Sequence, residues 1–420
     1  MESQVQEIMF LSAHHERVEG LMQRVNETTL LEAHLKQKAN KAVGIDGIGK
    51  EEYGKDFKAN ISNLIERMKK FQYRPKPVKR VYIPKSNGKR RPLGIPSYED
   101  RLVQYVMAWI LRGVYEPRFM DCSMGFRPQR GAHDVVRYID RAVMRGKVNW
   151  VLEADIKEFF DNVDQKILVE FLEHDIADKN FVRYIVRFFK SGIMEEGKYY
   201  ESDKGTPQGG LISPILANVY LHYVLDTWMM NVVKLQMRGE MYYIRYADDF
   251  LVFFENENDA KRVYNVLGKR LAKYGLELAK DKTRILPFGR NSGKGEEFDF
   301  LGFTYFNAKT RQGRYRLGVR SSQKKLKTKR KAVKEWIKEH RIIPVDKIMR
   351  ILNAKLTGHY AYYGINGNFD SIENFVDFAK ITAYKWLNRR SQRKSIGWKK
   401  FSEIWQKTIR KPKIMVQIWN

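Results

Sequence analysis

The sequence has little cysteine and no long hydrophobic run. Cys122 is the only cysteine among 420 residues, so the chain can form neither an intramolecular disulfide nor a cysteine-rich zinc site. No uninterrupted apolar run reaches the roughly 18 residues that a membrane helix needs. Charged residues interrupt the apolar positions near the N-terminus, which argues against a secretory signal. We therefore expect a cytoplasmic protein without a membrane partner.

Acidic residues are also scarce relative to basic ones. The chain has 49 Asp and Glu against 78 Lys and Arg, a formal net charge of +29. A folded protein this basic repels itself, and a polyanionic partner offsets that repulsion. The charge is not confined to one amphipathic helix, as it would be in a membrane-surface protein. Nucleic acid is therefore the partner that the composition predicts first.

The residue pattern predicts an α+β chain that ends in a helical bundle. Prolines and alternation predict a basic β-hairpin over 73–96, and apolar runs predict strands over 149–155 and 241–254. Helical spacing predicts an N-terminal helical extension over 1–40. Beyond residue 310 the composition shifts, and three further helices are expected at about 322–340, 345–357 and 371–387.

Three aspartates stand out because they lie at the ends of predicted strands. Asp155 ends one apolar strand, and the pair Asp248 and Asp249 lies between two others. Aspartate is depleted in strands and adjacent carboxylates repel each other, so the placement needs a reason. If the strands neighbour one another, the three form a concentrated negative site that suits Mg²⁺. Taken alone, an Ala-Asp-Asp sequence is more often an ordinary hairpin turn, and Asp155 could be a helix cap.

Five motifs in order give the chain a resemblance. They are Ser-Met-Gly-Phe-Arg-Pro at 123–128, Asp-Ile-Lys-Glu-Phe-Phe-Asp at 155–161, the glycine-rich block at 205–218, Tyr-Ala-Asp-Asp at 246–249, and Phe-Leu-Gly-Phe at 300–303. Together they resemble reverse transcriptases encoded by bacterial group II introns, over about residues 29–400. The resemblance implies a right-hand polymerase with fingers and palm over 41–310, where an antiparallel sheet packs with helices. A thumb, or maturase, bundle over 311–400 and a short basic tail over 401–420 would follow.

The resemblance also implies roles for the carboxylates and their neighbours. Asp155, Asp248 and Asp249 match the catalytic residues of the family. Asp155 and Asp248, completed by the Ile156 carbonyl, would hold the metal. The implied cofactor is a pair of Mg²⁺ ions, with Mn²⁺ as a substitute. Such a pair activates the attacking 3′-hydroxyl and stabilises the leaving pyrophosphate.

Further residues match positions that contact nucleotide or nucleic acid. Lys85 and Arg91 would neutralise the incoming triphosphate, Gln208 would line the pocket, and Lys282 would protonate pyrophosphate, although Lys280 lies close in sequence. Phe159 or Phe160 would exclude a 2′-hydroxyl, and Phe159 is preferred. Template and primer would meet a hairpin and a basic helix that contribute Leu301, Gly302, Lys324, Lys325, Lys327 and Arg330.

The predicted function is that of an RNA-directed DNA polymerase serving a group II intron in retrohoming. Its partners would be an RNA template, a DNA primer, dNTPs and the intron RNA, whose splicing it would assist. The lone Cys122 predicts that a cysteine-containing endonuclease is absent. Two alternatives stay open: a splicing factor with an idle polymerase, and a related reverse transcriptase used in host defence or DNA repair. The sequence does not indicate an oligomeric state.

Overall fold

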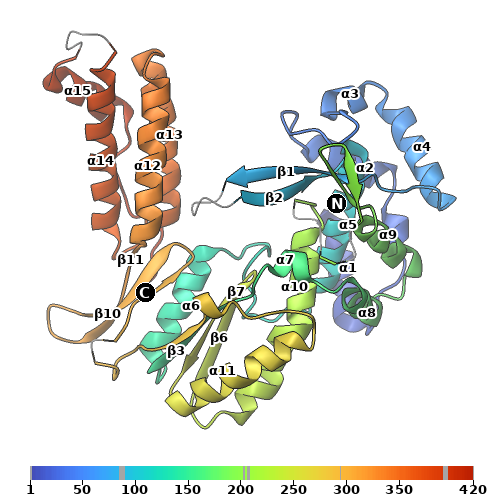
Figure 1. Ribbon diagram of the computed structural model, residues 1–420, viewed down its shortest axis with the longest axis horizontal. Helices are drawn as coiled ribbons and strands as arrows, with labels where there is room; N and C mark the ends of the chain where they lie inside the picture. Colours follow the sequence, from blue (N-terminus) through green and yellow to red (C-terminus); the bar gives the residue numbers. More distant parts are fainter. Residues whose placement is uncertain are drawn as a thin grey trace.

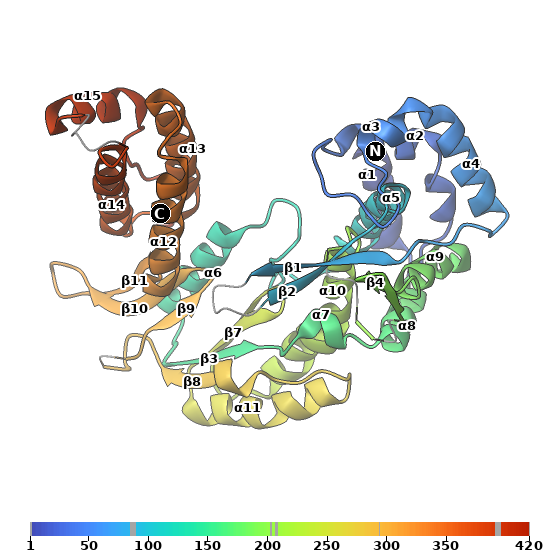
Figure 2. The ribbon, with the colours of Figure 1, turned by 45° about the horizontal axis from the view of Figure 1, so that its top comes forward.

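The protein is described by a computed structural model that covers residues 2–84, 90–201, 204–205, 209–293, 295–390 and 396–419. Figure 1 shows three parts: N-terminal helices with the hairpin β1–β2, a central sheet, and a bundle of long helices on the opposite side. The hairpin points toward the bundle across the sheet in both Figure 1 and Figure 2. Among the described residues, no helix has the length and apolar character required to cross a bilayer.

The N-terminal part is mainly helical. Its first 40 residues form α1 (Glu2–His14), a short turn of 3₁₀ helix η1 (Met22–Arg24) and α2 (Glu27–Lys36), so the predicted extension is interrupted. Helix α1 packs on α5 (Tyr98–Tyr115). Gly113 permits this approach, because a Cβ there would lie 2.9 Å from the Ile8 side chain. The remaining elements are α3 (Lys50–Lys55), α4 (Phe57–Lys69), α8 (Gln165–Asp175) and α9 (Lys179–Phe189).

A small sheet joins the predicted hairpin to a second one. Strands β1 (Val78–Pro84) and β2 (Arg90–Ile95) pair antiparallel, as predicted, and β1 also pairs in parallel with β4 (Ile193–Glu195). Strand β5 (Lys198–Tyr200) completes the order β2-β1-β4-β5. The hairpin therefore extends from a sheet that is anchored by α9 and its following turn.

The central sheet is the predicted one and is buried on both faces. Its antiparallel order is β6 (Met241–Tyr246), β7 (Asp249–Phe254), β3 (Trp150–Asp155) and β8 (Arg284–Pro287). Alternate residues enter two separate cores: Leu152 and Val252 enter one, and Val151 and Phe253 enter the other. Helices α10 (Ser213–Leu221) and α11 (Glu257–Ala272) share the first core, and α6 (Ala132–Arg145) shares the second. Burial of both faces explains why the strands are almost continuously apolar.

The helical connections of this central part include irregular turns. Helix α7 (Phe159–Asn162) is a single turn after β3, and η5 (Lys280–Lys282) is a 3₁₀ turn before β8. Helix α10 continues into the π-helical segments η2 (His222–Asp226) and η3 (Met229–Val233), followed by η4 (Lys234–Gln236). π-Helical insertions are rare and are frequently found near functional sites.

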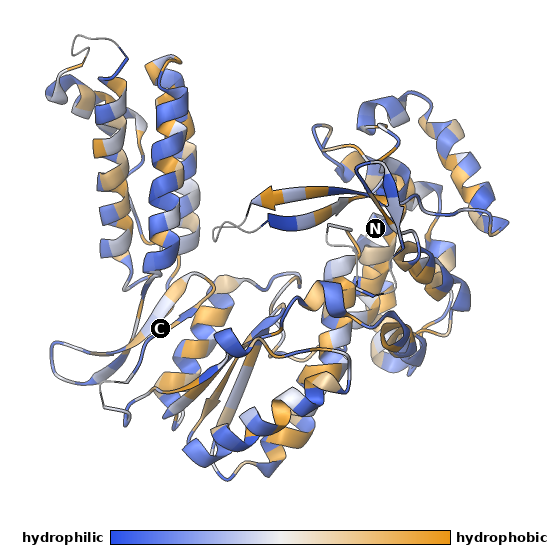
Figure 3. Ribbon diagram, viewed as in Figure 1, coloured by the Kyte–Doolittle hydropathy of each residue, from blue (hydrophilic) through white to orange (hydrophobic). Residues whose placement is uncertain are grey.

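The third part is a three-stranded sheet followed by four helices. Strands β9 (Phe298–Phe300), β10 (Phe303–Lys309) and β11 (Tyr315–Ser321) lead into α12 (Gln323–His340), α13 (Val345–Tyr363) and α14 (Phe369–Leu387), close to the three helices predicted. Figure 3 shows these helices as mixtures of hydrophilic and hydrophobic residues, as expected when each buries one stripe.

The C-terminal segment differs from the expected basic tail. Helix α15 (Trp398–Thr408) crosses the end of the bundle farthest from β10, as Figure 2 shows, and buries Phe401 and Trp405. The chain then returns along α13, where the Met415 amide donates to the Gly364 carbonyl at 2.6 Å. The predicted boundary at residue 400 therefore falls inside a helix. Aromatic residues at helical spacing among the lysines bind this segment to the core.

Candidate active site

Strand pairing alone brings the three aspartates together. In the β3–β7 register, Asp155 lies directly opposite Asp249, and Tyr246 of β6 lies opposite Asp249 on its other side. Directly opposed residues in antiparallel strands have Cβ atoms about 5 Å apart. Ala247 and Asp248 form the two-residue turn between β6 and β7, so Asp248 lies directly before Asp249 and close to Asp155. The apolar flanks that predicted a buried sheet therefore position the carboxylates.

The turn itself holds an unusual backbone conformation. Ala247 has φ of 58°, in the left-handed region that favours glycine, asparagine or aspartate. Two-residue hairpins need positive φ at one or both central positions, and here alanine takes that place. Strained conformations of this kind persist only when the surroundings determine them, and they cluster at functional sites.

The electrostatics of the site are those of crowded negative charge. Burial raises the pKa of Asp248, and the Asp155 carboxylate raises it further, while Arg91 and Lys282 lower it. Partial loss of water around Asp249, together with the carboxylates of Asp248 and Asp155, raises the pKa of Asp249 as well. Part of the Asp249 side chain still faces solvent, so water weakens this effect. A cation between these carboxylates would relieve their repulsion.

Lys282 contributes the cation seen beside Asp155. Its Nζ donates to an Asp155 carboxylate oxygen, and this hydrogen bond raises the pKa of Lys282. The amide of Ala279 donates to the Asp155 carbonyl at 2.9 Å, which ties the start of η5 to the end of β3. Of the two lysines considered from the sequence, Lys282 is therefore the one with a described contact to the site. Asp155 is buried, at 8% exposed, whereas the Lys282 side chain is 64% exposed, so Lys282 reaches the carboxylate from the solvent side.

The donor set can be tested for its fit to a metal ion. Among the described residues, no group of three or more His, Cys, Asp or Glu side chains is arranged to hold a metal. The predicted set instead combines Asp155 and Asp248 with the carbonyl of Ile156. Two backbone hydrogen bonds flank Ile156: the Lys157 amide donates to the Glu277 carbonyl, and the Ala279 amide donates to the Asp155 carbonyl. In this antiparallel pattern the backbone groups of Ile156 itself point away from residues 277–279, and its carbonyl therefore faces the side on which β7 lies. These are hard oxygen donors, so the residues fit a divalent ion that takes further ligands from substrate.

The predicted nucleotide contacts are only partly described. Lys85 and Gln208 lie outside the described residues. Arg91 is exposed on β2, and its charge lowers the pKa of Asp248, so it lies within electrostatic reach of the turn. Gly209, which follows Gln208, has φ of 111°, and a Cβ there would lie 2.5 Å from the Gly94 carbonyl oxygen. Glycine thus allows this block to pack against β2.

The two adjacent phenylalanines have different surroundings. Phe159 is 2% exposed and belongs to the core, with its ring 6.3 Å from that of Tyr220. Phe160 is partly exposed. An aromatic ring can exclude a 2′-hydroxyl only where a sugar can reach it. Burial therefore does not favour the preference for Phe159, and Phe160 becomes the better candidate.

The predicted template–primer contacts also divide by exposure. Leu301 and Gly302 form the turn between β9 and β10, but their carbonyls accept hydrogen bonds from Tyr362 at 2.7 Å and Ser322 at 2.9 Å. The turn thus anchors the bundle. On α12, Lys324, Lys325 and Lys327 are exposed. Arg330 instead lies over the Phe378 ring of α14 at 5.5 Å, so it is part of the bundle packing.

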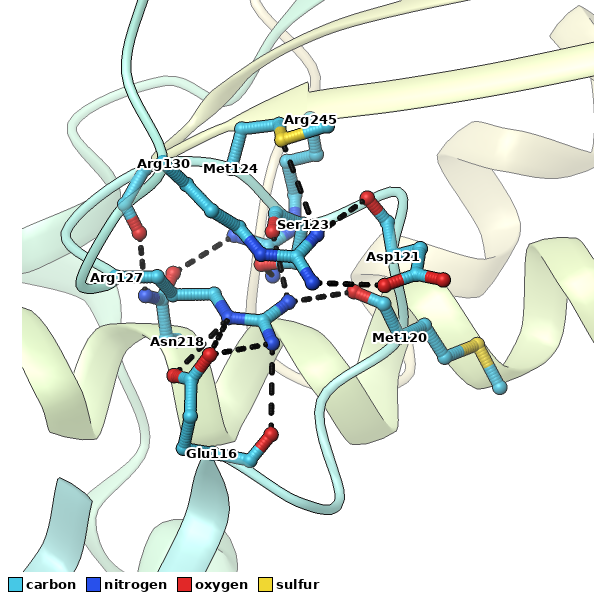
Figure 4. A network of polar contacts seen from close by, with 10 residues as sticks. Glu116, Met120, Asp121, Ser123, Met124, Arg127, Arg130, Asn218 and Arg245 are labelled. Atoms are coloured by element: carbon cyan, nitrogen blue, oxygen red, sulfur yellow. Dashed lines mark hydrogen bonds and ion pairs between the residues drawn. The ribbon is translucent and has the colours of Figure 1, made fainter. Parts of the chain in front are cut away.

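Sequence reasoning missed the polar residues beneath the turn. Arg245, Asp226 and Asn218 are buried, and Arg245 contacts both of the others. The signal was available, because Arg245 interrupts an otherwise aromatic and aliphatic strand. Figure 4 shows Arg245 and Asn218 among a network that includes Ser123 and Arg127 of the Ser-Met-Gly-Phe-Arg-Pro motif.

Comparisons with known proteins agree on a family. A family model described as reverse transcriptase (RNA-dependent DNA polymerase) matches residues 83–305. The chain is 37% identical over 254 residues to the group II intron-encoded protein LtrA of Lactococcus lactis subsp. cremoris, covering 59% of this chain and 41% of that protein. It is 32% identical over 318 residues to protein YkfC of Escherichia coli (strain K12), covering 67% and 81% respectively.

A more distant relative extends farther along the chain. An uncharacterized 91 kDa protein in the cob intron of Schizosaccharomyces pombe is 26% identical over 424 residues, which covers 84% of this chain and 51% of that protein. The chain thus spans less than half of LtrA and about half of the fission yeast protein.

Proposed function

The chain belongs to the reverse transcriptase family, with relatives among group II intron-encoded proteins, and we propose that it synthesises DNA on an RNA template. The observation that carries the proposal is the register that sets Asp155 opposite Asp249 beside the Ala247–Asp248 turn. A chain that only bound RNA would gain nothing from three carboxylates that repel both one another and a phosphate backbone.

Reverse transcriptases generally use divalent metal ions. In this chain Asp155, Asp248 and the Ile156 carbonyl would hold them, with two Mg²⁺ ions, or Mn²⁺ in their place, as the proposed cofactor. When bound, the ions lower the pKa of the attacking 3′-hydroxyl and neutralise charge on the leaving pyrophosphate. The resulting new bond joins the primer 3′-oxygen to the α-phosphorus of a dNTP, and the bond to pyrophosphate breaks.

The chain's own residues would orient and screen the nucleotide. Arg91, exposed on the hairpin and close enough to act on Asp248, would neutralise the triphosphate. Lys282, held near the reacting centre by Asp155, would supply a proton to the departing pyrophosphate. The partly exposed ring of Phe160 would lie under the sugar and exclude a 2′-hydroxyl.

The three parts of the fold would then take the roles of a right-hand polymerase. The proposed fingers and palm comprise residues 41–310 and contain the hairpin and the central sheet. The proposed thumb begins at residue 311 and includes α15, with the exposed Lys324, Lys325 and Lys327 facing the phosphates of the template–primer duplex. The intron RNA itself, whose splicing the chain would assist, is a proposed further partner because LtrA is a group II intron-encoded protein.

Primer extension on an RNA template tests the proposal. The unmodified protein should extend a DNA primer with dNTPs and Mg²⁺, and the double variant Asp248→Asn/Asp249→Asn should lose this activity by at least about 1,000-fold, on the scale of removing a principal electrostatic group. Asp346→Asn serves as the control, because Asp346 is an exposed carboxylate on α13. Persistent synthesis by the double variant would refute the assignment. Any help that the protein gives to intron splicing should survive in the double variant.

A further inference from the structure

Arg245 is a charged residue in the interior of the protein. It lies in β6 and is 0% exposed, as is Asp226 on the π-helical segment η2. The guanidinium donates through Nε to one Asp226 oxygen at 2.7 Å and through Nη2 to the other at 2.5 Å. Tyr243 also donates to Asp226 at 2.8 Å. This bidentate geometry compensates both charges, which buried ions require.

The remaining donors of Arg245 reach beyond its ion-pair partner. Nη1 donates to the Asn218 side-chain oxygen at 3.0 Å and to the Ala247 carbonyl at 3.1 Å. Nη2 also donates to the Ser123 hydroxyl at 2.7 Å. The planar fork of an arginine presents five N–H donors in fixed directions. Arg245 therefore connects the π-helical segment, α10 and the 123–128 motif to the turn that precedes Asp248.

The 123–128 motif contacts the same turn from a second side. Residues 122–124 lie beside β6, where the Arg245 amide donates to the Cys122 carbonyl at 2.8 Å and the Met124 amide donates to the Arg245 carbonyl at 2.9 Å. Gly125 then approaches the turn so closely that a Cβ there would lie 2.5 Å from the Ala247 nitrogen. Asn218 fixes Gly125 by donating to its carbonyl at 2.6 Å.

These contacts meet at the one turn residue with a left-handed backbone. Ala247 is touched at its nitrogen by the Gly125 segment and at its carbonyl by Arg245. The peptide that carries this carbonyl leads directly into Asp248. A small rotation of that peptide would redirect the Asp248 side chain and shift Asp249 relative to Asp155. The surroundings thus determine a conformation that alanine would not otherwise favour.

We propose that Arg245 is a positioning residue, which holds the Ala247 carbonyl and so aims Asp248 and Asp249 at Asp155. Gly125 is the second half of the device, because its missing side chain lets the 123–128 motif press on the turn. The inference rests on the proposed function, since it assigns a role in DNA synthesis. It gives the 123–128 motif a mechanical role that requires no contact with substrate.

A matched arginine separates positioning from ordinary stability. Arg118 is also bound to a fully buried carboxylate, because its Nη1 donates to Asp175 at 2.7 Å, and its Nε donates to the Ser12 hydroxyl at 2.8 Å. Its other described hydrogen bonds go to the carbonyls of Ser12, His15 and Glu16, so none of them reaches the turn or the 123–128 motif. Arg118 and Arg245 thus share a forked contact that includes a buried aspartate, and they differ at the turn.

The experiment compares Arg245→Lys with Arg118→Lys in steady-state primer extension. A lysine keeps the buried charge but cannot reproduce the fork. Arg245→Lys should lower kcat by about 100-fold, the effect of a misplacement of about 1 Å, with KM for dNTP and primer affinity unchanged. The Mg²⁺ concentration for half-maximal rate should also rise. Arg118→Lys should keep kcat and its Mg²⁺ dependence even where it lowers thermal stability to a similar extent.

A second pair of variants avoids the buried charge altogether. Gly125→Ala should lower kcat by about 10-fold without changing KM, because its methyl group displaces the turn. Gly268→Ala is its control, because a Cβ at Gly268, within α11, meets nothing within 4 Å. This pair decides the question if Arg245→Lys does not fold. The inference is refuted if Gly125→Ala and a folded Arg245→Lys retain kcat. It is also refuted if Arg118→Lys loses as much kcat and Mg²⁺ affinity as Arg245→Lys. Failure of the unmodified protein to extend primers would instead refute the proposed function.

Discussion

Replacing Asp226 with alanine would leave the Arg245 guanidinium charged and unpaired inside the protein. Both side chains are 0% exposed, so water cannot take over the role of the lost carboxylate. The change removes two charge-assisted hydrogen bonds from Arg245 and the acceptor used by the Tyr243 hydroxyl. Breaking a buried pair on one side typically costs about 3–5 kcal/mol of folding free energy. Each kcal/mol lowers Tm by about 2–4 °C for a unit of 150–250 residues, so a fall of about 6–20 °C is expected.

Thermal melting followed by tryptophan fluorescence measures this fall. Glu7→Ala is the control, because Glu7 pairs with Arg24 at an exposed position where the lost attraction is screened. Its melting midpoint should stay near that of the unmodified protein. If Asp226→Ala and Glu7→Ala had the same Tm, the buried pair would contribute no more to stability than a surface pair, and the reasoning would be wrong.

The reciprocal replacement makes the test sharper. The double variant Asp226→Leu/Arg245→Met removes both charges and fills the space with apolar atoms, so it should melt above Asp226→Ala despite carrying one more substitution. It also removes the donor to the Ala247 carbonyl. Recovery of Tm without recovery of kcat would separate the stability of the sheet from the orientation of its turn. Recovery of both would contradict the positioning role.

Two further predictions concern residues that the structure distinguishes by exposure. Phe160→Ala should increase incorporation of ribonucleotides relative to deoxynucleotides with little change in Tm, whereas Phe159→Ala should lower the free energy of unfolding by about 3–5 kcal/mol, because it empties a buried site. The reverse pattern would restore Phe159 as the candidate. Lys327→Gln should weaken template–primer binding and reduce the slope of log affinity against log salt by up to about 0.9, whereas Lys400→Gln on α15 should leave the slope unchanged. Equal slopes for the two variants would argue against a duplex track along α12.

The central sheet was predictable because successive residues of a strand face opposite sides of the sheet, and here both sets are apolar. Apolar side chains on most positions of β3 and on every position of β7 after Asp249 predict strands covered on both sides, and the aspartates at their ends then come together by pairing. The choice between Phe159 and Phe160 could not be made in the same way. Glu158 has φ of 46°, and this left-handed residue sets which ring of the next turn enters the core. Both side chains are phenylalanine, so the sequence does not indicate which of the two rings enters the core.

The boundary predicted at residue 400 falls inside α15 for a related reason. Lysines and aromatic residues alternate through α15, and the basic residues suggested a tail. What decides the structure is that Phe401 and Trp405 lie four residues apart on one face and are buried, while the neighbouring charged residues Lys399, Lys400 and Glu403 are exposed. Net charge counts every residue, whereas packing depends on one stripe. The residues 1–40 show the converse, since their helical spacing spans a break between α1 and α2.

Arg245 shows why a buried ion pair is worth keeping where an apolar pair would stabilise the fold at least as well. Hydrophobic replacements of buried pairs are often neutral or stabilising, so stability alone does not select Arg245 and Asp226. An apolar pair, however, has no N–H group for the Ala247 carbonyl, and that carbonyl belongs to the peptide before Asp248. Asp226 holds the guanidinium in one orientation, and the guanidinium transmits that orientation to the turn. The π-helical segment that carries Asp226 is then part of the active site's geometry, although it lies outside the carboxylates themselves.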